Sequence, residues 1–217
     1  MINLCFHGIG TPPRGLPAEE AAYWIGADTF RRVLDQVVDR PDVGLTFDDG
    51  NTSDVTVALP ELVDRGRIAE FFVIAGRLGN TGSLSADDVR GLHGARMGIG
   101  SHGMHHRVWR KLSRTDRHEE LVVARDRLEE VLDEPVSTAA CPLGRYDRAT
   151  LTALRRLRYV RVYTSDRALA RPGTWRQARF SLRAGDTADD VAVWLQHGDR
   201  YTVRVADAAR TFVKGLR

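Results

Sequence analysis

The sequence has few cysteines and no long apolar run. Cys5 and Cys141 are the only cysteines among 217 residues. Two distant cysteines in a chain of this size make no disulfide framework, so we expect both to be small buried residues. No apolar stretch approaches membrane-spanning length, and residues 1–6 are too short and lack the basic lead-in of a secretion signal. These absences predict a cytoplasmic protein without an integral membrane segment.

Lysine is nearly absent as well. Only Lys111 and Lys214 are lysines among the 32 basic residues, and the formal net charge is +3. No Lys/Arg block is mixed with aromatic residues, which argues against nucleic acid as a partner. The length and an apolar content of 42% fit one folded domain over residues 1–217. The oligomeric state stays open.

The stretch 45–51, Leu-Thr-Phe-Asp-Asp-Gly-Asn, holds the first candidate site. Apolar residues alternate with small or polar ones over 43–47, which predicts a short buried strand. Asp48 and Asp49 follow side by side, and two buried like charges need a retained proton or a cation. Neighbouring strand residues point to opposite faces, so the two aspartates can have different roles. Alone, the stretch favours a strand that ends in an Asp-Gly turn.

A second stretch, 98–106, contains three histidines within five positions. His102 and His106 are four residues apart, and on a helical turn their side chains would converge on one face. That spacing suits two imidazoles on one metal ion. Together with a carboxylate from the first stretch, they make a two-histidine, one-carboxylate set that leaves coordination positions open. We interpret His105 as a solvent-facing neighbour.

Together the two stretches resemble the polysaccharide deacetylases of carbohydrate esterase family 4, the nodulation-type deacetylase homology domain. The Thr-Phe-Asp-Asp-Gly motif of that family corresponds to residues 46–50, and its His-x-x-x-His motif corresponds to 102–106. The resemblance continues through Ala-Glu-Phe-Phe-Val at 69–73 and Cys-Pro-Leu-Gly-Arg-Tyr-Asp at 141–147. It spans roughly residues 43 to 165.

The pattern of elements alternates between strands and helices. We expect strands at 2–6, 43–48, 71–74, 97–101, 136–141, 159–164 and 180–182, a loop at 8–20, and helices at 24–39, 53–65, 85–94, 115–132, 147–157, 189–196 and 205–214. The alternation predicts parallel βαβ units, in a barrel or in an open doubly wound sheet. The resemblance implies the barrel, so the expected fold is α/β, a single domain with a distorted (β/α)7-type barrel.

The resemblance also implies the chemistry of the site. Asp49, His102 and His106 would bind a divalent metal, usually zinc, with Co2+, Ni2+ and Fe2+ as alternatives. Asp48 would be the general base that accepts a proton as water attacks. The expected activity is metal-dependent hydrolysis of a carbon–nitrogen amide bond, the N-deacetylation of an N-acetylated sugar, glycan or glycan precursor. A small-molecule or glycan substrate is the expected partner.

The third motif of the family departs from its usual Arg-x-Pro-Tyr-Gly. Ala140 replaces the arginine that orients the base, and Leu143 replaces the tyrosine, although the backbone N–H of Leu143 can still serve an oxyanion. The late histidine that acts as general acid in the family has no clear counterpart. His7, at the end of the first strand, is our candidate for a second catalytic residue.

Two further residues are candidates for substrate binding. Trp109 lies three residues beyond His106 and is the best candidate among the tryptophans for stacking on a sugar ring, while the alternative, core or rim packing, is the default for a tryptophan. Asp166 follows a strand and would hydrogen-bond a site residue or form a turn. Two other functions stay open, namely a deformylase or other small-amide hydrolase on the same scaffold, and a catalytically silent carbohydrate-binding domain.

Overall fold

The computed structural model describes residues 1–197, and its centre is a sheet of eight parallel strands. The strands are β1 (Ile2–Phe6), β4 (Val43–Asp49), β5 (Glu70–Val73), β6 (Gly98–Ser101), β7 (Thr138–Ala140), β8 (Arg161–Thr164), β9 (Arg176–Ala178) and β10 (Phe180–Ser181). Their spatial order is β10-β1-β4-β5-β6-β7-β8-β9. The two end strands of this order are therefore consecutive in the chain.

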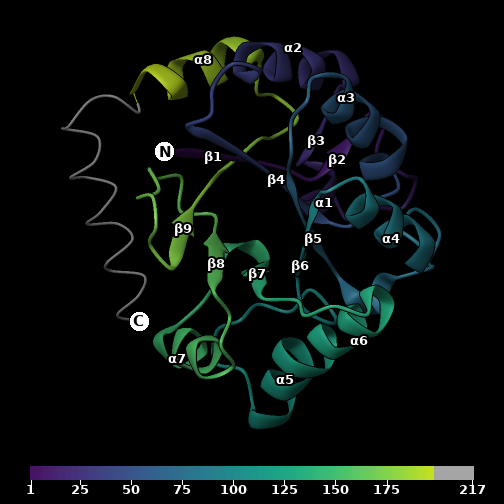
Figure 1. Ribbon diagram of the computed structural model, residues 1–217, viewed down its shortest axis with the longest axis vertical. Coiled ribbons are helices and arrows are strands. Elements are labelled where there is room, and N and C mark those ends of the chain that lie inside the picture. The colour runs from purple at the N-terminus through teal and green to yellow at the C-terminus, as the bar shows by residue number, and fades with distance from the viewer. Residues whose placement is uncertain (198–217) are drawn as a thin grey trace.

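Only Arg179 separates β9 from β10. On one side of it the chain pairs with β8, where Val162 lies opposite Arg176, and on the other it pairs with β1, where Leu4 lies opposite Phe180. The segment thus joins the two edges of the sheet and nearly closes it into a barrel (Figure 1). The predicted barrel is confirmed, and the strand expected at 180–182 corresponds to β10, whereas β9 on the other side of Arg179 is an additional strand.

Helices surround the barrel (Figure 1). They are α1 (Ala18–Ala21), α2 (Ala27–Val37), α3 (Leu59–Asp64), α4 (Ala86–Gly94), α5 (Arg114–His118), α6 (Ala124–Leu132), α7 (Arg148–Arg156) and α8 (Ala188–His197). Short π-helical segments, η1 (Asp54–Ala58) and η3 (Glu119–Val123), lead into α3 and α6, and 3-10 turns lie at η2 (Ala75–Arg77) and η4 (Pro142–Gly144). A separate parallel pair consists of β2 (Gly8–Ile9) and β3 (Trp24–Ile25).

Stacked phenylalanines build the core between the sheet and the helices. Phe47 of β4 lies 4.6 Å from Phe71 of β5 and 5.1 Å from Phe6 of β1, measured between ring centroids. Phe30 of α2 covers this stack with its edge toward Phe6. Because side chains alternate along a strand, Phe47 on this outer face sends Asp48 to the opposite face, the inside of the barrel. The alternation in the sequence thereby positions the site.

Most predicted elements are present, and local signals explain their limits. The capping box of Ser85 and Asp88 starts α4 as expected, and Pro60 lies in the first turn of α3 after the π-helical η1. The helix predicted over 24–39 begins only at Ala27, because 24–25 pairs with β2. The loop expected over 8–20 contains β2 and most of α1, and β9 was not predicted. The helix predicted over 205–214 lies outside the described residues.

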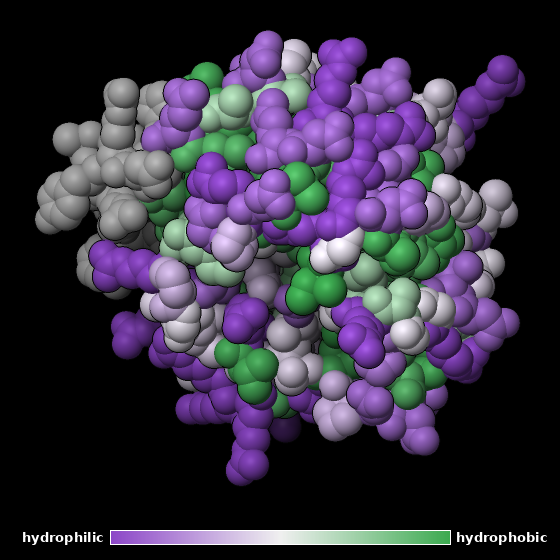
Figure 2. Space-filling model, turned by 45° about the horizontal axis from the view of Figure 1, so that its top comes forward, coloured by the Kyte–Doolittle hydropathy of each residue, from purple (hydrophilic) through white to green (hydrophobic). Residues whose placement is uncertain are grey.

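Hydrophilic side chains cover most of the face shown in Figure 2, with hydrophobic residues in patches between them. None of the helices within 1–197 combines the length and apolar character that crossing a bilayer requires. Both cysteines are buried and unpaired, as the sequence predicts.

Candidate active site

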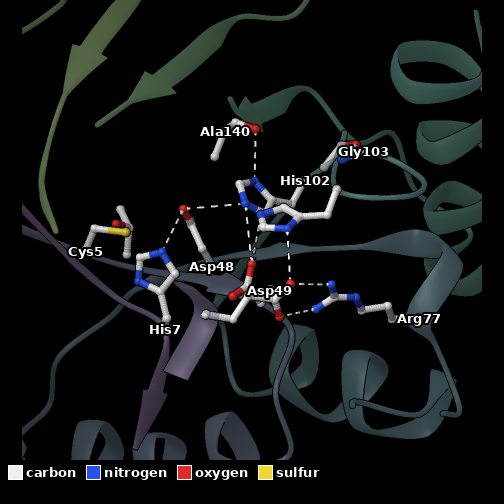
Figure 3. A network of polar contacts seen from close by, with 12 residues as sticks. Cys5, His7, Asp48, Asp49, Arg77, His102, Gly103 and Ala140 are labelled. Atoms are coloured by element: carbon white, nitrogen blue, oxygen red, sulfur yellow. Dashed lines mark hydrogen bonds and ion pairs between the residues drawn. The ribbon is translucent and has the colours of Figure 1, made fainter. Parts of the chain in front are cut away.

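The functional side chains gather at one edge of the barrel. Asp48 and Asp49 end β4, His7 follows β1, and His102 follows β6. Parallel strands point their carboxyl ends the same way, so residues far apart in sequence meet there (Figure 3). Asp49 has a φ of 79°, a strained value for a residue with a side chain, and the site holds it in place.

Asp49, His102 and His106 form a group that can hold a metal ion. Their ligand atoms all lie within 4.8 Å of one another. Asp49 Oδ1 is 3.6 Å from His102 Nε2 and 3.5 Å from His106 Nε2, and this buried oxygen accepts no hydrogen bond. An unpartnered carboxylate oxygen that faces two imidazole nitrogens fits the donor set of a divalent transition-metal ion. The residues predicted as ligands are therefore together, although the two histidines lie on a loop and not on a helical turn.

His102 is held in the tautomer that a metal ligand needs. Its Nδ1 lies 3.0 Å from the carbonyl oxygen of Ala140, which only accepts, so the proton is on Nδ1. The lone pair of Nε2 consequently faces Asp49. Burial lowers the pKa of His102 to about 4 despite the opposing charge of Asp48, and the ring is therefore neutral at pH 7.

His106 contacts a second carboxylate behind it. Its Nδ1 lies 3.7 Å from Glu20 Oε1, while its Nε2 faces Asp49. Arg77 binds Glu20 through two hydrogen bonds of 2.9 and 2.8 Å. The close contact with His106 and the hydrogen bonds from Arg77 lower the pKa of Glu20 to about 2, so Glu20 is an anion. Neither Glu20 of α1 nor Arg77 of η2 was predicted, because no sequence pattern links these elements to the histidines.

The loop that carries the histidines is fastened to Glu120, which has no exposed surface. Glu120 accepts hydrogen bonds from the backbone N–H of Met104 at 3.2 Å and His105 at 2.9 Å, and from the indole of Trp109 at 3.2 Å. Gly103 has a φ of 82°, and a Cβ at this position would lie 2.2 Å from Glu120 Oε2. Only glycine lets the loop approach this carboxylate.

Asp48 pairs with Arg179, the residue at the seam of the barrel. The guanidinium donates from Nη1 to Oδ1 at 2.6 Å and from Nη2 to Oδ2 at 2.7 Å, and both side chains are buried. Burial alone would raise the pKa of Asp48, but the positive charge of Arg179 outweighs it and holds that pKa well below its usual range. Asp48 is therefore ionised at neutral pH.

Arg179 also lies beside the position of the missing motif arginine. Its guanidinium carbon is 5.3 Å from the ring centroid of Phe72 and 5.7 Å from that of Tyr163. Ala140 packs in one cluster with these two rings. The charge that the family motif would supply from position 140 comes instead from position 179. The sequence indicated this only indirectly. Asp48 was expected to be buried, and the third motif, with Ala140, offers no cation to pair with it.

His7 lies on the other side of Asp48 from His102 (Figure 3). Its Nε2 is 4.0 Å from Asp48 Oδ2, its side chain is 14% exposed, and its ring packs on Tyr23 with centroids 4.7 Å apart. Cys5, His7 and Asp48 also form a group with metal-ligand spacing. Because Arg179 already binds both oxygens of Asp48, a second cation there would be repelled.

The remaining candidates differ in their access to the site. Leu143 is 49% exposed with a φ of 53°. Trp109 has no exposed surface and offers no face to a sugar ring, so it fills the alternative role in the core. Asp166 is buried and accepts hydrogen bonds from Tyr146 at 2.9 Å and Thr164 at 2.7 Å. It therefore holds the loop after β7, which contains Tyr146, in place.

A parallel barrel with a carboxylate and two imidazoles at its strand ends is typical of hydrolases with a metal centre. A sequence model of the family described as polysaccharide deacetylase matches residues 35–162, more than half of the chain. The chain therefore belongs to the polysaccharide deacetylase family, which confirms the resemblance. His7, Glu20 and Arg179 lie outside the matched span.

One curated relative is similar in sequence, and two solved structures are similar in fold. The putative polysaccharide deacetylase YxkH of Bacillus subtilis is 25% identical over 115 residues, 53% of this chain and 41% of that protein, so this chain matches less than half of the relative. The Streptococcus pyogenes deacetylase PplD, solved in complex with acetate, shares the fold at a TM-score of 0.77 and 22% identity, covering 92% of this chain and 98% of that one. IcaB from Ammonifex degensii shares the fold at a TM-score of 0.72 and 23% identity, and the match covers 90% of this chain and 96% of that one.

Proposed function

We propose that the protein is a metal-dependent N-deacetylase of an N-acetylated sugar, glycan or glycan precursor. The observation that carries this proposal is the buried Asp49 Oδ1, which lacks a hydrogen-bond donor and faces the Nε2 atoms of His102 and His106. Asp48 lies beside this group as an ionised carboxylate. A metal-ligand set next to a separate carboxylate base is what hydrolysis of an amide by water requires.

A divalent metal bound by Asp49, His102 and His106 would supply Lewis acidity to the acyl oxygen and to the attacking water. Asp48 accepts the proton of the water as the new carbon–oxygen bond forms. The backbone N–H of Leu143 donates to the oxygen that becomes negative. The carbon–nitrogen bond then breaks as a proton reaches the nitrogen, and His7 is the donor at the mouth of the site. The products are a carboxylic acid and an amine.

The ion pair of Arg179 with Asp48 favours this enzyme over a silent carbohydrate-binding domain. A silent domain has no need to keep a base ionised and oriented, and replacing a buried ion pair by apolar residues is often neutral or stabilising. Here the pair is buried and two-pronged, although the motif arginine is absent. Arg179 can therefore orient Asp48 in place of the missing motif arginine.

The test is acetate release from N-acetylglucosamine oligomers, with metal content measured alongside. Protein loaded with Zn2+, Co2+, Ni2+ or Fe2+ should release acetate, and chelator-treated protein should not. Asp49→Ala and His102→Ala should each strip the ion. Asp48→Asn should keep the ion and lose ~10²–10⁴-fold in turnover, the usual contribution of a general base.

Full activity of Asp48→Asn would show that Asp48 is not the base. Acetate release that survives complete removal of metal would contradict the metal dependence. Faster hydrolysis of matched N-formyl oligomers would identify the enzyme as a deformylase.

A further inference from the structure

A basic groove lies between α5 and α7 on the outside of the barrel. Its volume is about 730 Å³, and its lining includes five basic residues, Arg114, Arg117, His118, Arg148 and Arg156. A threonine and alanine, valine and leucine side chains complete the lining, which contains no acidic residue. We call this feature the basic groove.

Three of the five basic residues of the groove have no carboxylate partner among residues 1–197, whereas the charge of Arg117 acts on the nearby carboxylate of Asp147. Within residues 1–197, no carboxylate lies within ion-pair distance of Arg114, Arg148 or Arg156. The acidic residues nearest in sequence are engaged elsewhere. Asp116 binds Arg107 and Ser113, and Asp147 caps α7 through the backbone N–H of Thr150.

Arg117 shows that the groove also contains an unsatisfied donor. Its Nη2 donates to the carbonyl oxygen of Leu112 at 3.2 Å, but its Nε is buried and has no hydrogen-bond partner. A buried donor without an acceptor costs free energy, as do like charges held close together. An anionic group in the basic groove would offset both costs.

The basic groove adjoins the loops of the active site. α5 follows the loop that carries His106, and α7 follows the loop that carries Leu143. The two loops are joined by a β-bridge between Trp109 and Tyr146 and by a 2.8 Å hydrogen bond from the N–H of Lys111 to Asp147. An extended ligand can therefore reach both the basic groove and the catalytic loops.

We propose that the basic groove binds a phosphate or diphosphate group on the glycan whose N-acetyl sugar enters the active site. This inference rests on the proposed function and narrows its substrate class to phosphate-bearing glycans. Guanidinium groups match phosphate oxygens in geometry and charge. The positive charge of several guanidinium groups together is larger than a single carboxylate can neutralise. The apolar side chains of the lining offer no competing charge to a bound phosphate.

The experiment compares two substrates, a neutral N-acetylglucosamine tetramer and the same tetramer with a terminal diphosphate. At low salt, kcat/KM should favour the diphosphate form by about 10-fold or more, and the preference should shrink as salt is added. Arg148→Gln with Arg156→Gln should bring the preference to within about twofold and leave kcat/KM for the neutral tetramer unchanged. The control, Arg32→Gln with Arg127→Gln, removes the same charge from exposed helix positions and should keep the preference.

Equal kcat/KM for the two tetramers would overturn the inference, as would a preference that the control pair removes to the same extent. Tighter binding of a single-stranded DNA of equal charge, sensitive to the same two substitutions, would assign the groove to nucleic acid instead.

If neither tetramer is hydrolysed, the proposed function fails. Binding of the diphosphate tetramer, measured by titration calorimetry, then still tests whether the basic groove binds phosphate. In that case the diphosphate tetramer should bind about 10-fold more weakly to the groove variant than to the control. Equal binding to the two variants would overturn it.

Discussion

A buried carboxylate needs a cation, and at Asp48 that cation is a guanidinium with no exposed surface. Both oxygens of Asp48 are bound by Arg179, and Phe72 and Tyr163 pack around the pair. Its environment thus fixes both the charge and the orientation of Asp48. At the scale of single residues, the two neighbouring aspartates differ because one has an arginine and the other has two imidazoles.

Removal of Arg179 should impair Asp48 without affecting the residues proposed to bind the metal. Arg179→Met leaves Asp48 as an uncompensated buried charge, which should destabilise the fold by roughly 3–5 kcal/mol and lower turnover strongly. Metal content should be unchanged, because Asp49 and the histidines remain. The double variant Asp48→Asn with Arg179→Met should recover melting temperature without recovering turnover, as measured by calorimetry and acetate release.

Ala140→Arg offers a rescue in the Arg179→Met background. A guanidinium from position 140 would enter the space between Phe72 and Tyr163 and restore part of the lost turnover. No gain in turnover from a folded, metal-loaded rescue variant would show that position 179 is not equivalent to the motif position.

At the scale of elements, the short helix α1 and the turn after it support both histidines that flank the aspartates. Glu20 stands behind His106, and Tyr23 packs on His7. Arg77 of η2 and Arg183 fasten this segment through Glu20 and the hydroxyl of Tyr23, respectively. The segment therefore acts as a brace for the site although it lies outside the span that the family shares.

Glu20→Gln should weaken metal binding while the fold is retained. Carboxylates that hold a ligating histidine typically contribute 10–100-fold to metal affinity, and we expect a loss of about that size. Competition with a chromogenic chelator measures it without reference to activity. The matched control is Glu19→Gln, which changes an exposed neighbour and should leave affinity unchanged. Equal affinities in the two variants would refute this role for Glu20.

Local patterns predict most elements of the fold, whereas contacts between distant segments escape them. Strand β4 and the capping box of Ser85 follow from alternation and spacing within a few residues. Arg179 and Asp48 are 131 positions apart, and no local rule joins them. Trp109 shows the same limit, because its burial depends on Glu120, which reaches it from another helix. The metal group was predictable because its two motifs are themselves short.

At the scale of the whole molecule, the barrel depends on parts of the chain that the family match leaves out. β1 lies between β10 and β4, and it contributes Phe6 to the stack around Phe47. A fragment of residues 35–162 would expose this face of β4 and would lack Arg179. We therefore expect no cooperative thermal unfolding transition from it, in contrast to the full chain, by circular dichroism. A sharp transition from the fragment would show that the outer strands are dispensable.

The division of one segment into β9 and β10 has a consequence for the order of events at the ribosome. The ribosome synthesises the chain from the amino terminus. β1 and β8 therefore each keep one unpaired edge until residues 176–181 have been made. The same arrival delivers the counter-charge of Asp48. Closure of the sheet and compensation of the buried charge of Asp48 are therefore a single late step, which a shorter nascent chain cannot complete.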